Sequence, residues 1–316
     1  ITDDIATLTD VAAKNPADTE IADKLADAKA QLETAEGALT DATDQLTAID
    51  NATTPAEVAD AREAGQDAAD LSQTTADNSA QDVADAQAKS DQNLADAQKA
   101  ATDTITDNIA TIADNIQNIT DDIATLQDLA DKNPGDTTIA DKLADAQQQL
   151  TEAEAAKTAA ESDLDQVADQ TTLADVADVV NDAADQVAQA QENENQAQTD
   201  VDDAQQQSAT NLATAKDDAK EAINQNLRDI DDDITQITAD IDALEQIATD
   251  NPTNPTIADK LADAKEQLAA AETAKDAAQQ ALDAIDEQTT LADVATQEKA
   301  GCLLYTSDAA DDMQCV

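Results

Sequence analysis

Apolar residues follow a heptad spacing from Ile21 to Ile49, where successive apolar positions are separated alternately by four and three residues. This is the spacing of the a and d positions of a helix that packs against other helices. The pattern therefore predicts a helix of about 33 residues with one buried seam. The seam positions are Ile21, Leu25, Ala28, Leu32, Ala35, Leu39, Ala42, Leu46 and Ile49.

The same pattern recurs at a fixed interval of 118 residues. ITDDIATL begins at positions 1 and 119, the related ITADIDAL begins at 237, and IADKLADA begins at 21, 139 and 257. Near-copies at a constant period are typical of repeat arrays. The sequence predicts one helical repeat at 1–118, a second at 119–236 and a partial third at 237–301.

One seam position differs between the repeats. It is Leu39 in the first, Lys157 in the second and Lys275 in the third. A lysine can lie at the margin of a seam with its charged end in water, and this is the interpretation we prefer. The alternative is a polar residue that sets the register of the helices.

Sequence signals also define the ends of the predicted helices. The Asn-Pro pairs at 15–16, 133–134 and 251–252 end the preceding helix, since the residue before proline is disfavoured in helical conformation. Asp18, Asp136 and Asn254 then share one repeat position and are predicted N-caps. Pro255 fits the first position of a helix, where its missing N–H has no helical partner.

A second set of helix starts follows each seam helix. Thr54 and Glu57 have the spacing of a capping box, in which each side chain bonds the backbone of the other residue. Weaker versions are the segments 172–175 and 290–293, each of which pairs a threonine with an aspartate.

The segment from Leu173 to Asp250 contains neither glycine nor proline over 78 residues. A single helix of that length would be about 117 Å long. Extra steps of four in its apolar seam predict local relaxation of supercoiling. In the first repeat the equivalent seam holds small residues such as Gly65, Ser72 and Ser79, so the sequence leaves open whether Gly65–Ser90 is ordered. The seam consists of Val176, Val180, Ala183, Val187, Ala190, Glu194, Ala197, Val201, Ala204, Ser208, Leu212, Ala215, Ala219, Ile223, Leu227, Ile230, Ile234, Ile237, Ile241 and Leu244.

A long helix cannot bury its seam against a partner half its length. We therefore predict that the long helix belongs to two neighbouring bundles. Its first half would be the third helix of one bundle, and its second half would be the first helix of the next. This arrangement resembles spectrin-type repeats over residues 1–301, although the aromatic core residues usual in that family are absent here. The resemblance implies an all-α fold of tandem three-helix bundles, or coiled coil, linked by continuous helices into an elongated rod.

The composition is strongly acidic. The chain has a formal charge of −55, and the last fifteen residues contribute three aspartates and no lysine or arginine, which leaves −52 for 1–301. This balance argues against nucleic acid and anionic membranes as partners and predicts diffuse screening by cations. No apolar run approaches the roughly 20 residues of a membrane-spanning helix. High charge with few aromatic residues also raises disorder as an alternative, against which the periodicity argues.

The tail from Cys302 to Val316 differs from the rest of the chain. It contains both cysteines, the one methionine and the one tyrosine. Its reading CLLYTSDAADD resembles the translation of a transposon adapter used in sequencing libraries. We therefore interpret 302–316 as a non-native tail and the chain, which starts at Ile1, as a fragment of a larger, metagenomic reading frame.

Residues 1–301 offer few groups for catalysis. They contain no histidine, cysteine or tyrosine, and their glycines lie far apart, so we predict no enzyme, no catalytic residue, no cofactor site and no metal site. The aspartate run at 231–233 is a conceivable calcium ligand set. It lies on a predicted helix, however, where successive side chains diverge, so a solvated acidic face is the preferred interpretation.

Three functional hypotheses fit these features. The first is a structural spacer or stalk of a repetitive, acidic bacterial surface or secreted protein, similar to an adhesin. The second is a set of three-helix modules that bind an unknown protein partner, for which no aromatic anchor is present. The third is an intracellular coiled-coil scaffold. The first hypothesis predicts an extracellular or cell-surface location, whereas the third predicts a cytoplasmic one.

Overall fold

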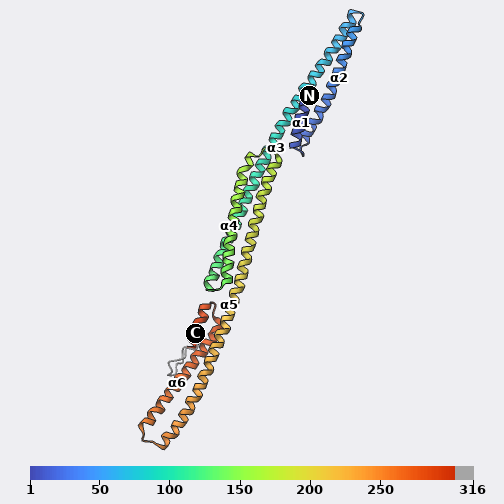
Figure 1. Cartoon of the computed structure of the whole chain (residues 1–316). Coiled ribbons are helices and arrows are strands. Elements are labelled where there is room, and N and C mark those ends of the chain that lie inside the picture. Colours follow the sequence, from blue (N-terminus) through green and yellow to red (C-terminus); the bar gives the residue numbers. More distant parts are fainter. Residues whose placement is uncertain (303–316) are drawn as a thin grey trace. The chain divides into compact units, whose positions relative to one another are not determined.

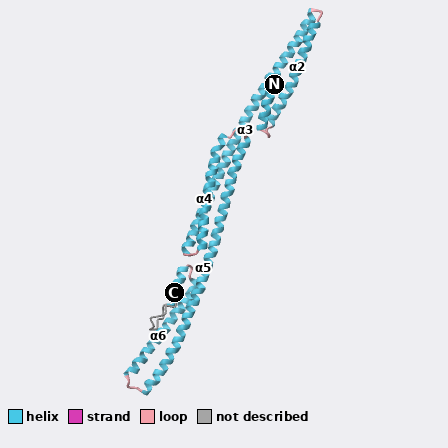
Figure 2. Ribbon diagram, in the orientation of Figure 1, coloured by secondary structure: helices cyan, strands magenta, loops and turns pink. Residues whose placement is uncertain are grey.

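The computed structural model describes residues 1–302 (Figure 1), which form seven α-helices and two short 3₁₀ turns. No strand occurs in this part of the chain (Figure 2), so the predicted all-α class is confirmed. The elements in order are α1 (Thr2–Lys14), α2 (Thr19–Asn51), α3 (Pro55–Lys132), α4 (Thr137–Gln166), η1 (Val167–Asp169), α5 (Leu173–Asp250), α6 (Pro255–Ala284), η2 (Ile285–Glu287) and α7 (Leu291–Cys302).

The two long helices, α3 and α5, each contain 78 residues, and their bounds differ by 118 positions. The uninterrupted helix predicted from Leu173 to Asp250 is therefore confirmed. The stretch from Gly65 to Ser90, whose order the sequence left open, is helical throughout as part of α3. α2 contains 33 residues, as its heptad pattern predicts.

The predicted N-caps begin three equivalent helices. The carboxylate of Asp18 accepts hydrogen bonds from the backbone N–H of Glu20 (2.9 Å) and Ile21 (3.1 Å) at the start of α2. Asp136 caps α4 in the same way. Asn254 accepts from the N–H of Thr256 (3.1 Å) at the start of α6, whose first residue is Pro255. Each cap satisfies backbone donors that the helix itself cannot.

The predicted capping box at the start of α3 is also present. The N–H of Glu57 donates to Thr54 Oγ1 (3.3 Å), and the N–H of Thr54 donates to Glu57 Oε2 (2.9 Å). At α5 and α7 an aspartate is too short to reach the threonine backbone. It instead accepts from the threonine hydroxyl, as between Thr172 and Asp175 (2.7 Å). These helix starts were correctly predicted because capping is a local interaction.

Three apolar clusters lie within residues 1–302, and three helices contribute to each. The first joins α1, α2 and α3 around Leu8, Ile21 and Ala86. In the second, α4, η1 and α5 pack with Ala101 and Ile105 of α3. The third joins α5, α6 with η2, and α7 through residues that include Ile223, Ala278, Ile285 and Val294. Alanine is common in all three, so the helices bury modest apolar area per residue.

The chain divides into two compact units. The first comprises Ile1–Ile116 with Glu152–Glu192, and the second comprises Gln117–Thr151 with the residues from Asn193 onward. The helices α3 and α5 contribute to both units. These units are defined by packing, whereas the repeats 1–118, 119–236 and 237–301 are defined by sequence, so the repeat boundaries stay a prediction.

The seam predicted for α5 is confirmed, since each of its members is buried or half-buried. The seam of α2 is correct at Ile21 and Ala28, which are fully buried, and wrong at Leu39 and Leu46, which are 67% and 64% exposed. The reason is that α1 is much shorter than α2. Among residues 1–302 it accompanies only the first part of α2.

The lysines at the variable seam position extend to the surface. Lys157 is half-buried and its Nζ lies 3.2 Å from Glu161 one helical turn away, and Lys275 lies 2.5 Å from Asp231. This geometry matches the preferred interpretation of a lysine at the seam margin. The tail at 302–316 lies almost entirely outside the described residues, so its interpretation as adapter sequence stays a prediction.

Candidate functional site

A polar cluster stands at the turn between α1 and α2, and we call it the turn cluster: Asn15, Asp18, Ser90 and Asn93. The amide of Asn15 donates to Ser90 Oγ (2.8 Å) and to the carbonyl of Val11 (2.9 Å). The amide of Asn93 donates to Asp18 Oδ2 (2.7 Å) and to Asn15 Oδ1 (3.2 Å). The cluster therefore fixes the turn against one position along α3.

The same cluster recurs 118 residues later at the turn between α3 and α4, as Asn133, Asp136, Ser208 and Asn211. Asn133 donates to Ser208 Oγ (2.8 Å), and Asn211 donates to Asp136 Oδ2 (2.6 Å) and Asn133 Oδ1 (3.1 Å). Gln207 adds a bond to Asp136 (3.2 Å). Each aspartate thus both caps a helix and accepts an amide from a helix far away in sequence.

A second polar group, which we call the lysine cluster, lies farther along the same helices. Lys24 Nζ is 3.0 Å from Asp82 and 2.9 Å from Asp85 on α3, and Gln31 donates to Asp82 (2.9 Å). Both carboxylates face a single lysine, so one cation on α2 holds two turns of α3.

The lysine cluster also recurs, as Lys142, Gln149, Asp200 and Asp203. Lys142 Nζ lies 2.9 Å from Asp200 and 2.7 Å from Asp203, and Gln149 donates to Asp200 (3.1 Å). The Asp200 side chain is only 1% exposed. A carboxylate so buried needs a partner of opposite charge, which makes this interaction a strong constraint on how α4 pairs with α5.

The electrostatics of both clusters stabilise the charged forms. The Asn93 amide, followed by the backbone N–H of Ile21, holds the pKa of Asp18 below its ordinary value, and Asn211 acts likewise on Asp136. Asp203, followed by Asp200, raises the pKa of Lys142 to about 12. These shifts keep the acids ionised and the lysine protonated near neutral pH, so none of them is poised for proton transfer.

The pKa values of two other aspartates are shifted in the opposite direction, above the ordinary value of 3.8. Burial, assisted by the nearby charge of Glu194, raises the pKa of Asp122. Burial also raises the pKa of Asp163, with a smaller contribution from Asp182. Like charges are therefore close enough to oppose one another inside the packed regions, as the acidic composition predicts.

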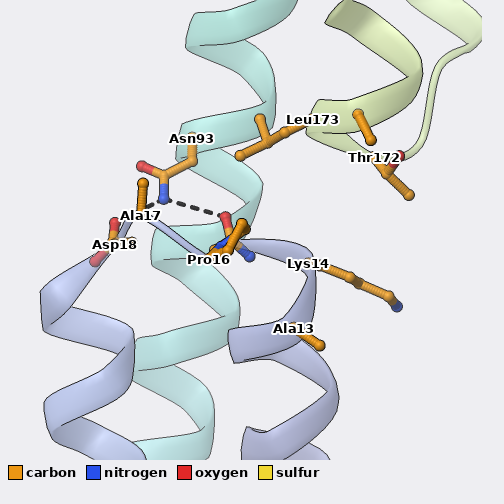
Figure 3. Close-up of a pocket in the computed structure, with 10 residues that line it drawn as sticks. Ala13, Lys14, Pro16, Ala17, Asp18, Asn93, Thr172 and Leu173 are labelled. Atoms are coloured by element: carbon orange, nitrogen blue, oxygen red, sulfur yellow. Dashed lines mark hydrogen bonds between the residues drawn. The ribbon is translucent and has the colours of Figure 1, made fainter.

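A pocket of about 680 Å³ adjoins the first turn cluster (Figure 3). It lies between the α1–α2 turn, Asn93 of α3 and the start of α5 at Thr172 and Leu173. Each polar side chain in its lining is already engaged by a neighbour: Lys14 by Asp10, Asn93 by Asp18, and Thr172 by Asp175. The pocket consequently offers an apolar hollow without converging polar groups to orient a ligand.

Within residues 1–302, no group of three or more acidic, histidine or cysteine side chains is arranged to hold a metal ion, and this includes the aspartate run at 231–233. The helices described there are nowhere both long and apolar enough to cross a membrane.

Sequence reasoning identified only part of these clusters. Asn15 was recognised as the end of a helix and Asp18 as a cap, whereas their links to Ser90 and Asn93 and the whole lysine cluster were missed. The usable signal was recurrence, because Lys24, Asp82 and Asn93 keep their identity at the equivalent positions Lys142, Asp200 and Asn211. Residue spacings typical of catalytic or metal-binding motifs do not reveal such pairs, which lie 51 or more residues apart.

Comparison with known proteins returned nothing similar: the chain matches no protein-family model, no curated protein and no solved structure.

Proposed function

We propose that this chain is a structural spacer or stalk segment of a long, repetitive bacterial surface or secreted protein, without catalytic activity. Its task would be to hold other parts of that protein at a distance from one another. Its acidic surface would keep it soluble and discourage collapse through self-repulsion.

One observation supports this proposal above the others. The turn cluster occurs twice with the same four residue types, and corresponding hydrogen-bond lengths agree within 0.1 Å, as 2.8 Å from asparagine to serine and 2.7 Å against 2.6 Å to aspartate. Its side chains bind one another and leave little to offer a substrate. A repeated polar cluster that sets the register of the helices is expected in a structural protein, whose function depends on its dimensions.

Small-angle X-ray scattering of the full chain tests the spacer function. A compact chain of this length would have a radius of gyration near 20 Å. A spacer longer than one 78-residue helix, which alone measures about 117 Å, would exceed 34 Å by the relation for a thin rod. A value near the compact limit would overturn the proposal.

Long-read sequencing of the locus separates the surface stalk from the intracellular scaffold, which would share this fold. A signal peptide, further 118-residue repeats and a wall or membrane anchor would support the extracellular or cell-surface location. A short reading frame that lacks them would contradict that location and favour the cytoplasmic scaffold.

A further inference from the structure

An uncovered apolar surface lies on the second half of α2 and the first turns of α3. We call it the open face: Leu39, Leu46, Val58 and Leu71, which are 67%, 64%, 38% and 46% exposed. A groove of about 330 Å³ between the two helices adjoins this face at Leu39, and small residues such as Ala42 and Ala69 form part of its lining. Exposed large apolar side chains of this kind are a feature of surfaces that bind another element.

The next repeat contains the Leu46 and Val58 part of this surface in covered form, whereas Lys157 and Gln189 stand at the positions of Leu39 and Leu71. Leu164 and Val176 are the repeat equivalents of Leu46 and Val58, at a separation of 118 residues. Val176 is 4% exposed and Leu164 is half-buried, because both belong to the cluster that includes Ala101 and Ile105 of α3. The helix that covers this surface in the second repeat is therefore known.

From this comparison we propose that the open face binds an α-helix equivalent to residues 97–118, supplied by another copy of the 118-residue repeat. The bound helix would occupy the position that α3 takes beside Leu164 and Val176. Its seam would place the equivalents of Ala101 and Ile105 on Leu46 and Val58.

The length of such a helix fits the space that α1 leaves. Residue 118 immediately precedes Ile119, which is the repeat equivalent of Ile1. A helix equivalent to 97–118 therefore ends just where α1 begins and does not compete with it. Its 22 residues span about 33 Å, comparable to the 19 residues from 33 to 51 of α2 at about 28 Å.

A second copy of the chain could also cover the open face with its own open face. The charges of the two surfaces argue against this arrangement. The segments 33–51 and 55–76 together carry ten acidic residues and one arginine, whereas 97–118 carries three aspartates and one lysine. Contact between two open faces would bring two strongly acidic surfaces together and cause strong repulsion. A helix equivalent to 97–118 carries only a small negative charge, so the repulsion would be weaker. Residual repulsion predicts tighter binding at higher salt.

The test uses a fluorescent peptide of residues 97–118 titrated with the full chain, with anisotropy measured at low and high salt. We expect saturable binding of one peptide per chain that tightens with salt, together with a gain in helical circular dichroism. Leu46→Asp in the chain is expected to weaken binding at least tenfold. Because Leu46 is already exposed, this change is expected to leave the helical content of the chain intact.

Two controls make the outcome specific. Thr47→Asp adds the same charge one residue away, on an exposed position, and is expected to retain binding. A peptide with Ile105→Asp and Ile112→Asp is expected not to bind. Absence of saturable binding at either salt, or binding that Leu46→Asp does not change, would overturn the proposal.

Sedimentation of the chain alone examines the second-copy alternative. A dimer that Leu46→Asp dissociates and the peptide does not displace would assign the open face to a second open face and overturn the proposal. The spacer function is judged separately from the dimensions of the chain in solution, so failure of one proposal does not imply failure of the other.

Discussion

At the scale of single residues, buried polar groups determine how the helices align. Asp200, with its side chain 1% exposed, can be accommodated only where Lys142 and Gln149 reach it. A shift of α4 along α5 by one turn would separate these groups by about 5.4 Å and leave a buried charge without a partner. An apolar alanine seam alone tolerates such shifts more easily.

Replacing Lys142 is expected to destabilise the chain. In Lys142→Met the aspartate loses its cation in a poorly hydrated position, which should cost about 1–3 kcal/mol and lower the urea midpoint followed by circular dichroism. The control Lys99→Met removes an exposed pair with Asp103 and should change stability by no more than about 0.5 kcal/mol. Equal midpoints for the two variants would contradict the role assigned to Lys142.

The amide of Asn211 is expected to control the ionisation of Asp136. In Asn211→Ala the aspartate loses its largest stabilising hydrogen bond, so its pKa should rise toward the ordinary value of 3.8. Carboxyl carbon NMR shifts measured against pH would report this change. Gln236→Ala, which removes a surface bond to Asp240 on the same long helix, should leave the titration of Asp136 unaltered.

At the scale of elements, the continuity of α3 and α5 is the main feature. Each runs for 78 residues and contributes to both packed units. The absence of proline within α5 permits this continuity, and its seam supplies the apolar contacts. Isolated helices of such low apolar content would be marginal, so their stability depends on packing.

A proline within α5 should therefore disrupt the chain more than a glycine at the same position. Ala209 is exposed, so its side chain contributes little to packing. Ala209→Pro removes a backbone hydrogen bond and should cost about 3 kcal/mol or more, whereas Ala209→Gly should cost about 1 kcal/mol. Thermal unfolding followed at 222 nm distinguishes them. If both variants unfolded at the same temperature as the parent, α5 would not be continuous at this position.

At the scale of the whole molecule, excess negative charge opposes the packing of acidic helices against one another. The 71 acidic residues far outnumber the sixteen lysine and arginine residues, which leaves a formal charge of −55. Burial, with a smaller contribution from nearby acidic groups, raises the pKa values of Asp122 and Asp163, so part of this repulsion is felt locally. Stability should consequently depend on both salt and pH.

Stability is expected to pass through a maximum on acidification. Asp122 and Asp163 have raised pKa values in the folded chain, so folding gains stability as pH falls from 7 through those values. Asp18, Asp136 and Glu57 have lowered values, so their contribution is present above their ordinary pKa and is lost as pH falls below it toward the folded values.

The melting temperature at constant ionic strength should thus rise as the pH falls from 7 toward the ordinary pKa values of glutamate (4.5) and aspartate (3.8), and should fall at lower pH. Asp122→Asn, which removes one of the opposing charges, should raise the melting temperature at pH 7 and reduce the gain on acidification. A continuous decrease from pH 7 downward would show that the lost caps and ion pairs outweigh the relieved repulsion.

The sequence alone determined the helical segments and their ends. The heptad steps gave α2 its length, the Asn-Pro pairs and the residues Asp18, Asp136 and Asn254 defined starts and stops, and the missing breakers gave α5 its full extent. These features follow from sequence because turns, caps and helix periodicity depend on residues within about four positions of one another.

The tertiary structure decided which parts of those helices meet. The sequence treated Leu46 and Leu164 as equivalent, yet one is 64% exposed and the other packs with Ala101 and Ile105. Likewise, nothing near Lys142 in the sequence indicates that Asp200, 58 residues away, is its partner. Burial and pairing across such distances depend on the surfaces that neighbouring helices present. A local sequence pattern indicates that a helix has an apolar seam. Only the packed chain determines which helix, if any, buries that seam.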